Sequence, residues 1–584
     1  MPKSILSLSK VNKTFDSKDY RVKAIDTMSF AVKTGKVTGL IGPDGAGKTT
    51  LMRLACGILT PDSGDFEVMG IDVSKEPLQV QSHIGYMPQR FGLYEDLTVQ
   101  ENLDLYADLQ NVAKDKRQSR YDELMHMMGM SPFTKRLAGK LSGGMKQKLG
   151  LACTLIRSPK LLLLDEPTVG VDPVSRRELW EIVYRQVHEQ GMSVLLSTAY
   201  LDEAERCDEV VLLHEGKLIM QGDPKEFSQT VDGRVFQVTV GNSKHRSLQQ
   251  KLSQNPAVLD ALIEGEGVRL VMVEQNLPKA KTLLPEMVKA NNEINITAIA
   301  PRFEDAFIAR LKTKQNITEH SISQIQVSGS VDDEVIRVEN LSRKFADFTA
   351  VDKINFHVKR GEIFGLLGAN GAGKSTAFRM LCGLLPVSSG KVAVAGTDLR
   401  VATASARGKI GYMAQKFSLY TDLSVKQNLK FFSSAYGLRK KSQQNRIDWA
   451  LETFELHDYQ DTNAGNLPLG YKQRLSFAAA LMHEPEILFL DEPTSGVDPL
   501  ARREFWQRTN ALAEMGVTIL VTTHFMDEAN YCDRLVIMSK GKILASGTPL
   551  DMKNLARTES QPDPSMEDAF IYLIQEKEQP DDHE

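Results

Sequence analysis

GPDGAGKTT at residues 42–50 recurs as GANGAGKST at residues 368–376. Both stretches fit G-x-x-x-x-G-K-[ST], and each follows an apolar run of strand type and precedes a run of helix type. Glycines in such a loop let backbone N–H groups close around phosphates at the N-terminus of the following helix. Two copies in the same strand-to-helix context make a chance match a poor explanation. The sequence therefore predicts an α/β fold with two phosphate-binding loops.

The two loops belong to a longer internal repeat. GYMPQ at 85–89 returns as GYMAQ at 411–415, and LLLLDEPTVGVDP at 161–173 returns as ILFLDEPTSGVDP at 487–499. Each stretch is displaced by 326 residues, as are the loops themselves. A repeat of this kind fixes the domain organisation, and a chain of 584 residues is too long for one hydrophobic core. We therefore predict a duplicated domain.

The composition limits the classes of function. An apolar content of 42% and a charged content of 25% are typical of a soluble α/β protein. The net charge of −4 provides no basic field, so we expect no nucleic-acid partner. The five cysteines form no CxxC pair, which suits a reducing compartment. No apolar run approaches the roughly 20 residues that span a bilayer, so we expect that the chain itself forms no pathway through a membrane.

The spacing of the repeat changes towards the end of each copy. PRFEDAFI at 301–308 returns as PSMEDAFI at 564–571, an offset of 263, so the first copy carries about 63 additional residues. These alternate runs of strand and helix type, at 234–240, 245–254, 268–273, 279–291 and 294–300, which predicts a small α/β appendage with either a packing or a regulatory role. The expected boundaries are 1–230 for the first copy, 231–311 for the appendage, 312–333 for a polar linker, 334–556 for the second copy and 557–584 for a C-terminal extension.

The loops and the strand ends supply the candidate catalytic groups. The loop residues expected at the phosphates of a bound nucleotide are Gly42, Asp44, Gly45, Gly47, Lys48, Thr49 and Thr50 in the first copy, and Gly368, Asn370, Gly371, Gly373, Lys374, Ser375 and Thr376 in the second. The lysines would reach the β and γ phosphates, and Thr49 and Ser375 would ligate Mg²⁺. Two apolar strands end in paired carboxylates, Asp165 with Glu166 and Asp491 with Glu492. The aspartates are placed to hold Mg²⁺, and the glutamates to orient or deprotonate the attacking water.

In these motifs both copies resemble the nucleotide-binding domains of ATP-binding cassette (ABC) proteins, over most of the chain. The resemblance implies two P-loop ATPase cores, each with an antiparallel β subdomain and a helical subdomain, acting on ATP with Mg²⁺. It also implies roles outside the loops: adenine stacking for Phe15 and Phe345, sensing of Mg²⁺ and of a membrane partner for Gln89 and Gln415, capping of the opposite domain's ATP for Ser142, Gly143 and Gly144 of LSGGMKQ, an interface position for Asp172 and Asp498, and contact with the γ-phosphate for His524.

Each copy departs from the family pattern. The first copy reads STAYLDEA where the second reads TTHFMDEA, so Ala199 stands at the histidine position. The second copy reads LPLGYKQ at 467–473, so Pro468 and Leu469 replace the signature Ser and Gly. Proline supplies neither a hydroxyl nor an N–H, and leucine obstructs the close approach that glycine permits. Asp44 also places an acid near anionic phosphates, where the second copy has Asn370.

These departures predict how the two copies pair. In the family, each ATP lies between the phosphate loop of one domain and the signature helix of the other. All departures would then fall in site one, built on the first loop, whereas site two would combine Lys374, Asp491, Glu492 and His524 with the intact LSGGM. Pairing of like with like would leave no complete site. We therefore predict intramolecular pairing, with hydrolysis at site two and a largely structural ATP at site one.

The sequence predicts the ATP-hydrolysing subunit of an export complex. LYEDLTVQENL, GVDPxxRRxxW, MDEAxxCD and PxxEDAFI resemble the ATPase subunits of ABC-2 and drug-type exporters. This implies two separate ABC-2-type transmembrane subunits and a peripheral position at the cytoplasmic face of the inner membrane. Two alternatives remain, a soluble tandem-ABC factor of the ribosome and the tandem ATPase of a sugar importer. The helices with Arg176, Arg177 and Trp180, and with Arg502, Arg503 and Trp506, are interpreted as packed amphipathic helices.

Overall fold

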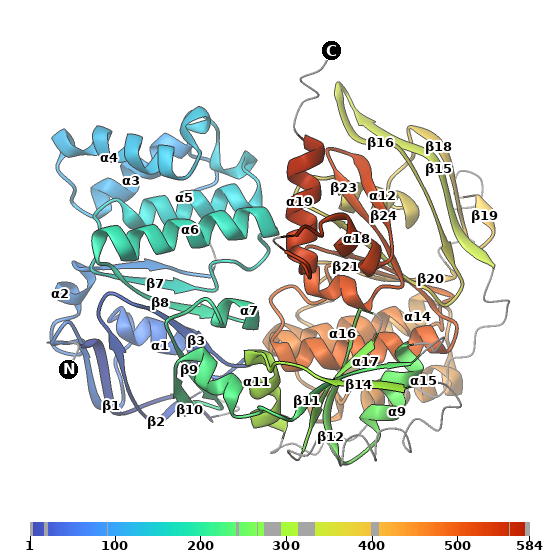
Figure 1. Cartoon of the computed structure of the whole chain (residues 1–584), viewed down its shortest axis with the longest axis horizontal. Helices are drawn as coiled ribbons and strands as arrows, with labels where there is room; N and C mark the ends of the chain where they lie inside the picture. Colours follow the sequence, from blue (N-terminus) through green and yellow to red (C-terminus); the bar gives the residue numbers. More distant parts are fainter. Residues whose placement is uncertain are drawn as a thin grey trace. The chain divides into compact units, whose positions relative to one another are not determined.

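The computed structural model describes residues 4–16, 21–89, 92–240, 245–265, 267–273, 294–312, 333–398, 408–559 and 561–578. The chain divides into two compact units (Figure 1). Unit 1 comprises Met1–Thr230 and Arg302–Phe307, and unit 2 comprises Val231–Pro301 and Ile308–Glu584. Residues 313–332 of the predicted linker, the predicted helix at 279–291 and residues 579–584 of the acidic C-terminus lie outside the described residues.

Unit 1 contains two sheets within its described part. The antiparallel sheet has the order β2-β1-β4-β5, with bounds Arg21–Lys33, Ser4–Asp16, Ser63–Val68 and Ile71–Asp72. The larger sheet has the order β10-β9-β3-β8-β7-β6, with bounds Lys217–Gly222, Glu209–His214, Val37–Ile41, Ser193–Thr198, Leu161–Asp165 and Ile84–Met87. Its strands are parallel except β10, and β3, β7 and β8 are buried throughout. Burial on both faces explains why these strands read as continuous apolar runs.

Helices on unit 1 carry the motifs. α1 (Lys48–Ala55) follows the phosphate loop, and α6 (Pro173–Gln190) and α7 (Leu201–Ala204) follow β7 and β8. α3 (Val99–Leu109), α4 (Lys114–Met127) and α5 (Gly143–Leu155) form the predicted helical subdomain, and α2 (Pro77–Gln81), α8 (Pro224–Gln229) and the short turns η1 (Ser131–Phe133) and η2 (Ala138–Lys140) complete the unit. α3 begins with a capping box in which Thr98 and Glu101 each accept from the other's backbone N–H.

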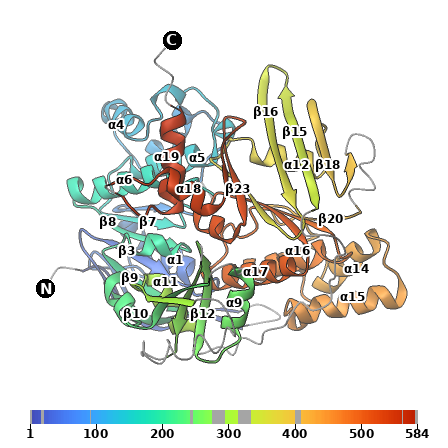
Figure 2. The ribbon, with the colours of Figure 1, turned by 45° about the vertical axis from the view of Figure 1, so that its right-hand side comes forward.

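The second copy, within unit 2, repeats this plan. Its antiparallel sheet has the order β16-β15-β18-β19, with bounds Phe348–Lys359, Glu334–Phe345, Ser389–Val394 and Thr397–Asp398. Its larger sheet has the order β20-β21-β22-β17-β23-β24, with bounds Ile410–Met413, Ile487–Asp491, Thr518–Thr523, Ile363–Gly368, Arg534–Ser539 and Lys542–Gly547. Figure 2 shows β15, β16 and β18 apart from α14 and α15, with β20 between them.

The helical elements of the second copy follow the same order. They are α12 (Lys374–Leu381), α14 (Val425–Ala435), α15 (Lys440–Thr453), η3 (His457–Tyr459), η4 (Ala464–Asn466), α16 (Leu469–Ala480), α17 (Pro499–Glu514), η5 (Met526–Tyr531), α18 (Pro549–Leu555) and α19 (Met566–Glu578). The two copies therefore share the predicted three-part α/β architecture. Across the described residues, no helix has the length and apolar character needed to cross a membrane.

The appendage is an antiparallel sheet with one described helix. Its strands have the order β12-β13-β11-β14, with bounds Val258–Glu264, Gly267–Met272, Val235–Val240 and Ile294–Ala298, and α9 (His245–Ser253) packs against β12. Leu248 and Leu252 of α9 bury their side chains with Phe236, Val238 and Leu270. The strand β12 was not predicted. The appendage belongs to unit 2 and therefore to the same compact unit as the second copy.

The segment PRFEDAFI forms the start of α11 (Phe303–Lys312), and its repeat forms the start of α19. Phe303 packs against Phe227 of α8 with 5.3 Å between ring centroids, and its N–H donates to Glu205 at 2.8 Å. Arg302–Phe307 are accordingly part of unit 1, whereas the predicted boundary assigned them to the appendage. The appendage is therefore an insertion between α8 and α11.

Candidate functional site

The two phosphate loops have the same geometry. Each wraps around its own lysine: Lys48 Nζ donates to the carbonyl oxygens of Gly42 and Pro43 at 2.7 and 3.1 Å, and Lys374 Nζ donates to those of Gly368 and Ala369 at 2.7 and 3.0 Å. The lysines are buried, with 6% and 5% of their surface exposed. A buried ammonium held by a glycine-rich turn at a helix N-terminus suits a phosphate ligand.

Glycine is required at the last loop position before each helix. Gly47 and Gly373 have φ of 100° and 99°, in the left-handed region. A Cβ at Gly47 would lie 2.4 Å from the carbonyl oxygen of Ala24, and one at Gly373 would lie 2.5 Å from that of Ala350. Both atoms are backbone, so a side chain at either position would displace the loop.

The strand-end carboxylates lie next to the loops. In the first copy, Thr49 Oγ1 donates to Asp165 at 3.2 Å, and Ser197 Oγ of β8 donates to the same oxygen at 2.7 Å. In the second copy, Thr522 Oγ1 donates to Asp491 at 2.5 Å. Carboxylate and hydroxyl oxygens are the ligands that Mg²⁺ accepts together with phosphate oxygens. The predicted donor set therefore fits Mg²⁺. Ser197 and Thr522, which no sequence motif indicated, also contact these aspartates.

The glutamates after these aspartates are strained and firmly held. Glu166 and Glu492 have φ of 50° and 46°, an uncommon conformation for a residue with a side chain. The Glu166 N–H donates to Ser197 Oγ at 2.9 Å, and the Glu492 N–H donates to Thr522 Oγ1 at 3.1 Å. The side-chain amides of Gln89 and Gln415 donate to the two carboxylates at 2.5 and 2.6 Å. The structure thus brings the predicted catalytic glutamate and glutamine together in both copies.

The copies differ at Ala199 of the first copy and His524 of the second, which we call the switch position. His524 Nδ1 lies 3.1 Å from the Glu492 carboxylate, and its side chain is 1% exposed. Its Nε2 is buried and makes no hydrogen bond to any residue that the structure describes, which suits an additional acceptor such as a phosphate oxygen. Ala199 occupies the same position in the first copy and is equally buried. Only the second copy therefore has an imidazole beside its glutamate.

This difference changes the acidity of the two glutamates. Burial, together with the charges of Asp165 and Asp44, raises the pKa of Glu166 to about 7. Burial also acts to raise the pKa of Glu492, but the interaction with His524, together with Lys374 and Gln415, outweighs burial and holds that pKa below its usual value. Glu492 is therefore the glutamate that stays ionised over the wider pH range. The charge of Asp44, which stands where the second copy has Asn370, contributes to the rise in the pKa of Glu166.

The two signature helices begin differently. In the first copy Ser142 is the N-cap of α5, and its side chain accepts from the Met145 N–H at 3.3 Å. Gly144 allows close packing, because a Cβ there would lie 2.6 Å from Ser175 Oγ. In the second copy the N-cap of α16 is Pro468, whose side chain cannot accept a hydrogen bond. The intact sequence therefore gives a capped helix, whereas LPLGY gives an uncapped one.

Other predicted residues are placed as follows. Phe15 and Phe345 lie at the ends of β1 and β15 and are 40% and 42% exposed. Exposed rings at these positions remain candidates for stacking on adenine. Asp172 and Asp498 are the N-caps of α6 and α17 and accept from backbone N–H groups there. This capping explains an aspartate at each position, and an additional interface role stays a prediction.

Sequence reasoning missed one polar cluster, which is present in both copies. Glu203 accepts from Trp180 Nε1 at 3.1 Å, from Thr168 at 3.0 Å and from Thr198 at 2.6 Å. The counterpart Glu528 accepts from Trp506 Nε1 at 3.1 Å, from Thr523 at 2.6 Å and from Thr494. Each cluster ties the segment after the catalytic glutamate to the residue before the switch position. The recurrent DEA at 202–204 and 527–529 is the signal that could have identified it.

Comparison with known proteins identifies the family. The protein-family model described as "ABC transporter" matches residues 25–169 and 351–495. The "Probable multidrug ABC transporter ATP-binding protein YbhF" of Escherichia coli (strain K12) is 52% identical over 98% of this chain and 98% of its own length. The chain belongs to the ABC transporter family. Its two ABC domains are ATPase domains, which bind and hydrolyse ATP.

Shorter ABC relatives align with part of the chain. The "Nod factor export ATP-binding protein I" of Sinorhizobium fredii (strain NBRC 101917 / NGR234) is 38% identical over 40% of this chain and 69% of its own length. The "Linearmycin resistance ATP-binding protein LnrL" of Bacillus subtilis (strain 168) is 39% identical over 37% of this chain and 70% of its own length. The tandem ABC arrangement is thus shared with the Escherichia coli protein over nearly the full length of both chains.

Proposed function

We propose that this ABC ATPase drives export through separate transmembrane subunits. Three relatives are named for multidrug transport, Nod factor export and linearmycin resistance, and these names favour export over sugar import or ribosome binding. Two ABC-2-type membrane proteins would complete the transporter, and the chain would act at the cytoplasmic face of the membrane. Purification from solubilised membranes tests this: co-elution with two membrane proteins supports export, and co-sedimentation with ribosomes would overturn it.

The proposal assigns different roles to the two ATP sites. The contact between His524 and Glu492 is the observation that carries it, because Ala199 leaves the first copy without this group. Pairing of the two ABC domains within one chain would set the second phosphate loop against the capped helix α5, and the first against the uncapped helix α16. Site two would then hydrolyse ATP, and site one would bind ATP and hydrolyse it slowly.

The chain's own residues explain the chemistry at site two. Lys374 holds the phosphates, Glu492 accepts the proton of the attacking water, and His524 donates to the γ-phosphate as negative charge develops there. Mg²⁺, when bound by the hydroxyl of Ser375 and by Asp491, with Gln415 nearby, supplies charge neutralisation to the phosphate oxygens. In the first copy Thr49, Asp165 and Gln89 provide the same ligand types. Binding of ATP and Mg²⁺ is therefore expected at both sites, and rapid hydrolysis at one.

Replacement of each catalytic glutamate tests this assignment. Glu492→Gln should abolish most of the ATPase activity, whereas Glu166→Gln should leave most of it. The two changes are matched, since both glutamates have the same backbone conformation and accept from an equivalent glutamine. Equal losses of activity in the two variants would refute the functional asymmetry.

A further inference from the structure

The appendage packs against the second copy through contacts that connect to residues 522–528, the switch segment around His524. Asp260 of β12 forms an ion pair with Arg503 of α17, and their side chains are 3% and 7% exposed. On the same helix, Asn510 Nδ2 donates to Gln249 Oε1 of α9 at 3.0 Å, and both residues are buried. Lys312 Nζ of α11 also donates to Asp260 at 2.7 Å. Buried polar contacts of this kind favour one arrangement of the packed elements.

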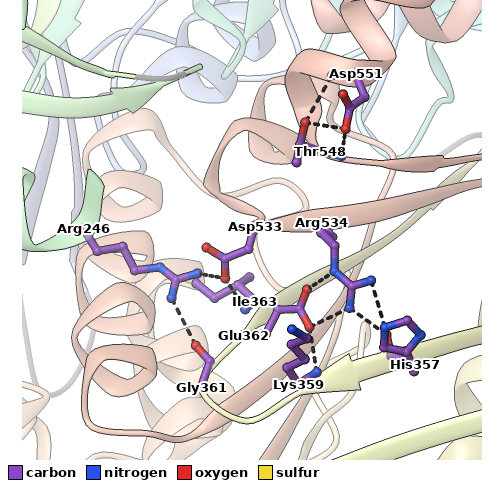
Figure 3. A network of polar contacts seen from close by, with 10 residues as sticks. All are labelled: Arg246, His357, Lys359, Gly361, Glu362, Ile363, Asp533, Arg534, Thr548 and Asp551. Carbon is purple, nitrogen blue, oxygen red and sulfur yellow. Dashed lines mark hydrogen bonds and ion pairs between the residues drawn. The ribbon is translucent and has the colours of Figure 1, made fainter. Parts of the chain in front are cut away.

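A third contact joins the appendage to the strand that leads to the phosphate loop (Figure 3). Arg246 of α9 pairs with Asp533 and donates to the Gly361 carbonyl at 3.1 Å. Asp533 also accepts from the N–H of Ile363, the first residue of β17, at 2.8 Å. Arg246 therefore provides the positive charge beside a carboxylate that fixes the start of this strand.

In the first copy, the corresponding aspartate at the start of the strand is paired without the appendage. This aspartate, Asp208, accepts from the Val37 N–H at 2.8 Å and pairs with Lys36 of its own copy at 3.3 Å. The position of Lys36 is occupied in the second copy by Glu362, which pairs with Arg534 instead. The second copy thus has an acid where the first has its cation, and the appendage supplies the arginine.

The helix α17 also differs from α6 at a position that contacts the appendage. Tyr184 of α6 donates to the carbonyl of Arg206 within the first copy at 2.7 Å. Its counterpart in α17 is Asn510, whose amide instead reaches Gln249 of the appendage. Among the residues of the second copy that contact the appendage, Arg503, Gly361 and Asp533 match Arg177, Gly35 and Asp208 of the first copy, and Asn510 differs. At this position the second copy has a contact with the appendage in place of a contact within its own copy.

One stripe of α17 connects this face to the switch histidine. Arg503, Trp506 and Asn510 follow each other at spacings of three and four residues, so they share one side of the helix. Arg503 and Asn510 hold the appendage, while Trp506 donates to Glu528. Glu528 accepts from Thr523, the residue that precedes His524. The appendage therefore fixes the helix whose tryptophan fixes the base of the switch segment.

We propose that the appendage is a positioning module for site two, in which Asp260, Gln249 and Arg246 hold α17 and β17 so that His524 lies at its working distance from Glu492. The proposal rests on the assignment of hydrolysis to site two. It gives the inserted segment a role in the reaction at the second copy, although the segment is encoded within the first. Asp260 is a positioning residue here, because it acts through α17, Trp506 and Glu528.

The test compares Asp260→Asn with Glu264→Gln in the full chain. Both changes convert a carboxylate of the appendage to an amide, but Glu264 pairs with Arg269 of the appendage itself, at 3.6 Å. Asp260→Asn should lower kcat for ATP about 10-fold with KM within about twofold, since small misplacement of a catalytic group affects the chemical step more than binding. Glu264→Gln should retain the wild-type kcat. An unchanged kcat in Asp260→Asn would overturn the proposal.

The His524→Ala background separates positioning from general loosening. If Asp260 acts through His524, adding Asp260→Asn to His524→Ala should change the single-turnover rate less than about twofold. The same factor on both backgrounds would overturn the proposal. Amide hydrogen exchange of residues 522–528 provides a readout independent of activity: it should rise in Asp260→Asn and stay at the wild-type level in Glu264→Gln, and equal exchange in both variants would also count against the proposal.

Two further variants keep the outcomes distinct. Gln249→Ala removes a single hydrogen bond to Asn510 and should lower kcat less than Asp260→Asn does, again with little change in KM. It provides the test should Asp260→Asn reduce the yield of folded chain. Glu492→Gln serves as the reference for site two. Full activity in Glu492→Gln would refute the assignment of hydrolysis to site two, whereas loss of activity there with wild-type behaviour of Asp260→Asn and Gln249→Ala would refute only the role of the appendage.

Discussion

Replacement of His524 by alanine should convert the switch position of the second copy into that of the first. Loss of one donor to charge that develops in the transition state typically lowers the rate by about 10² to 10³, which corresponds to about 2.7 to 4 kcal/mol. The imidazole lies 3.1 Å from Glu492 and is almost fully buried, so water does not readily replace it. We therefore expect kcat of the whole chain to fall by at least about 100-fold.

The first copy indicates that the variant should fold. The N–H of Tyr200, after Ala199, donates to Thr198 Oγ1 at 2.9 Å, and the N–H of Phe525, after His524, donates to Thr523 Oγ1 at 2.9 Å. The switch segment thus keeps the same local hydrogen bond with alanine as with histidine. Loss of one partner of the buried Glu492 should cost no more than about 3 kcal/mol of folding free energy.

Steady-state phosphate release and binding of a fluorescent ATP analogue are the assays. Because the interaction with His524 is strongest in the transition state, kcat and kcat/KM should fall together while the affinity for the analogue changes little. A fall in kcat of less than about fivefold would refute the reasoning, since Ala199 would then not be expected to slow hydrolysis at site one.

Three further predictions concern other residues of the chain. Ala199→His combined with Pro468→Ser and Leu469→Gly should raise ATP turnover by up to about twofold, whereas Ala199→His alone should leave phosphate release unchanged, because defects in one site act as a unit. Ser142→Ala should destabilise the chain by about 1 kcal/mol through loss of the N-cap and lower kcat at least about 10-fold, while Pro468→Ala should change neither unfolding nor turnover. Burial lowers the pKa of His483 to about 4. The unfolded chain binds that proton near pH 6.5, so about 2 kcal/mol of stability should be lost between pH 7 and 5, and urea unfolding of His483→Gln should show a smaller loss.

The sequence predicted the parts of the site that depend on local patterns. The phosphate loops, the strands that end in Asp165 and Asp491, and the difference between Ala199 and His524 all follow from short motifs in a repeated context. Both the fold class and the three-part plan of each copy are confirmed.

Long-range pairing could not be predicted in this way. The contact of Asp260 with Arg503 joins residues of two segments that share no motif, and Arg503 was interpreted only as part of a packed helix. The strand β12 was not predicted because its sequence, VLDALIE, has a charged residue, Asp260, at a buried position. A regular strand pattern would have an apolar residue there. One partner of that carboxylate, Arg503, lies in the second copy, so this pairing is visible only in the folded chain.

The nucleotides that remain bound after one turnover test the central claim most directly. Full-length protein is loaded with radiolabelled ATP, Mg²⁺ is added, and the bound nucleotides are separated after a time that exceeds one turnover of the fast site. The asymmetric account predicts two nucleotides per chain, of which one has become ADP and the other is still ATP. Conversion of both nucleotides at the same rate would contradict it, because the two sites would then be equally competent.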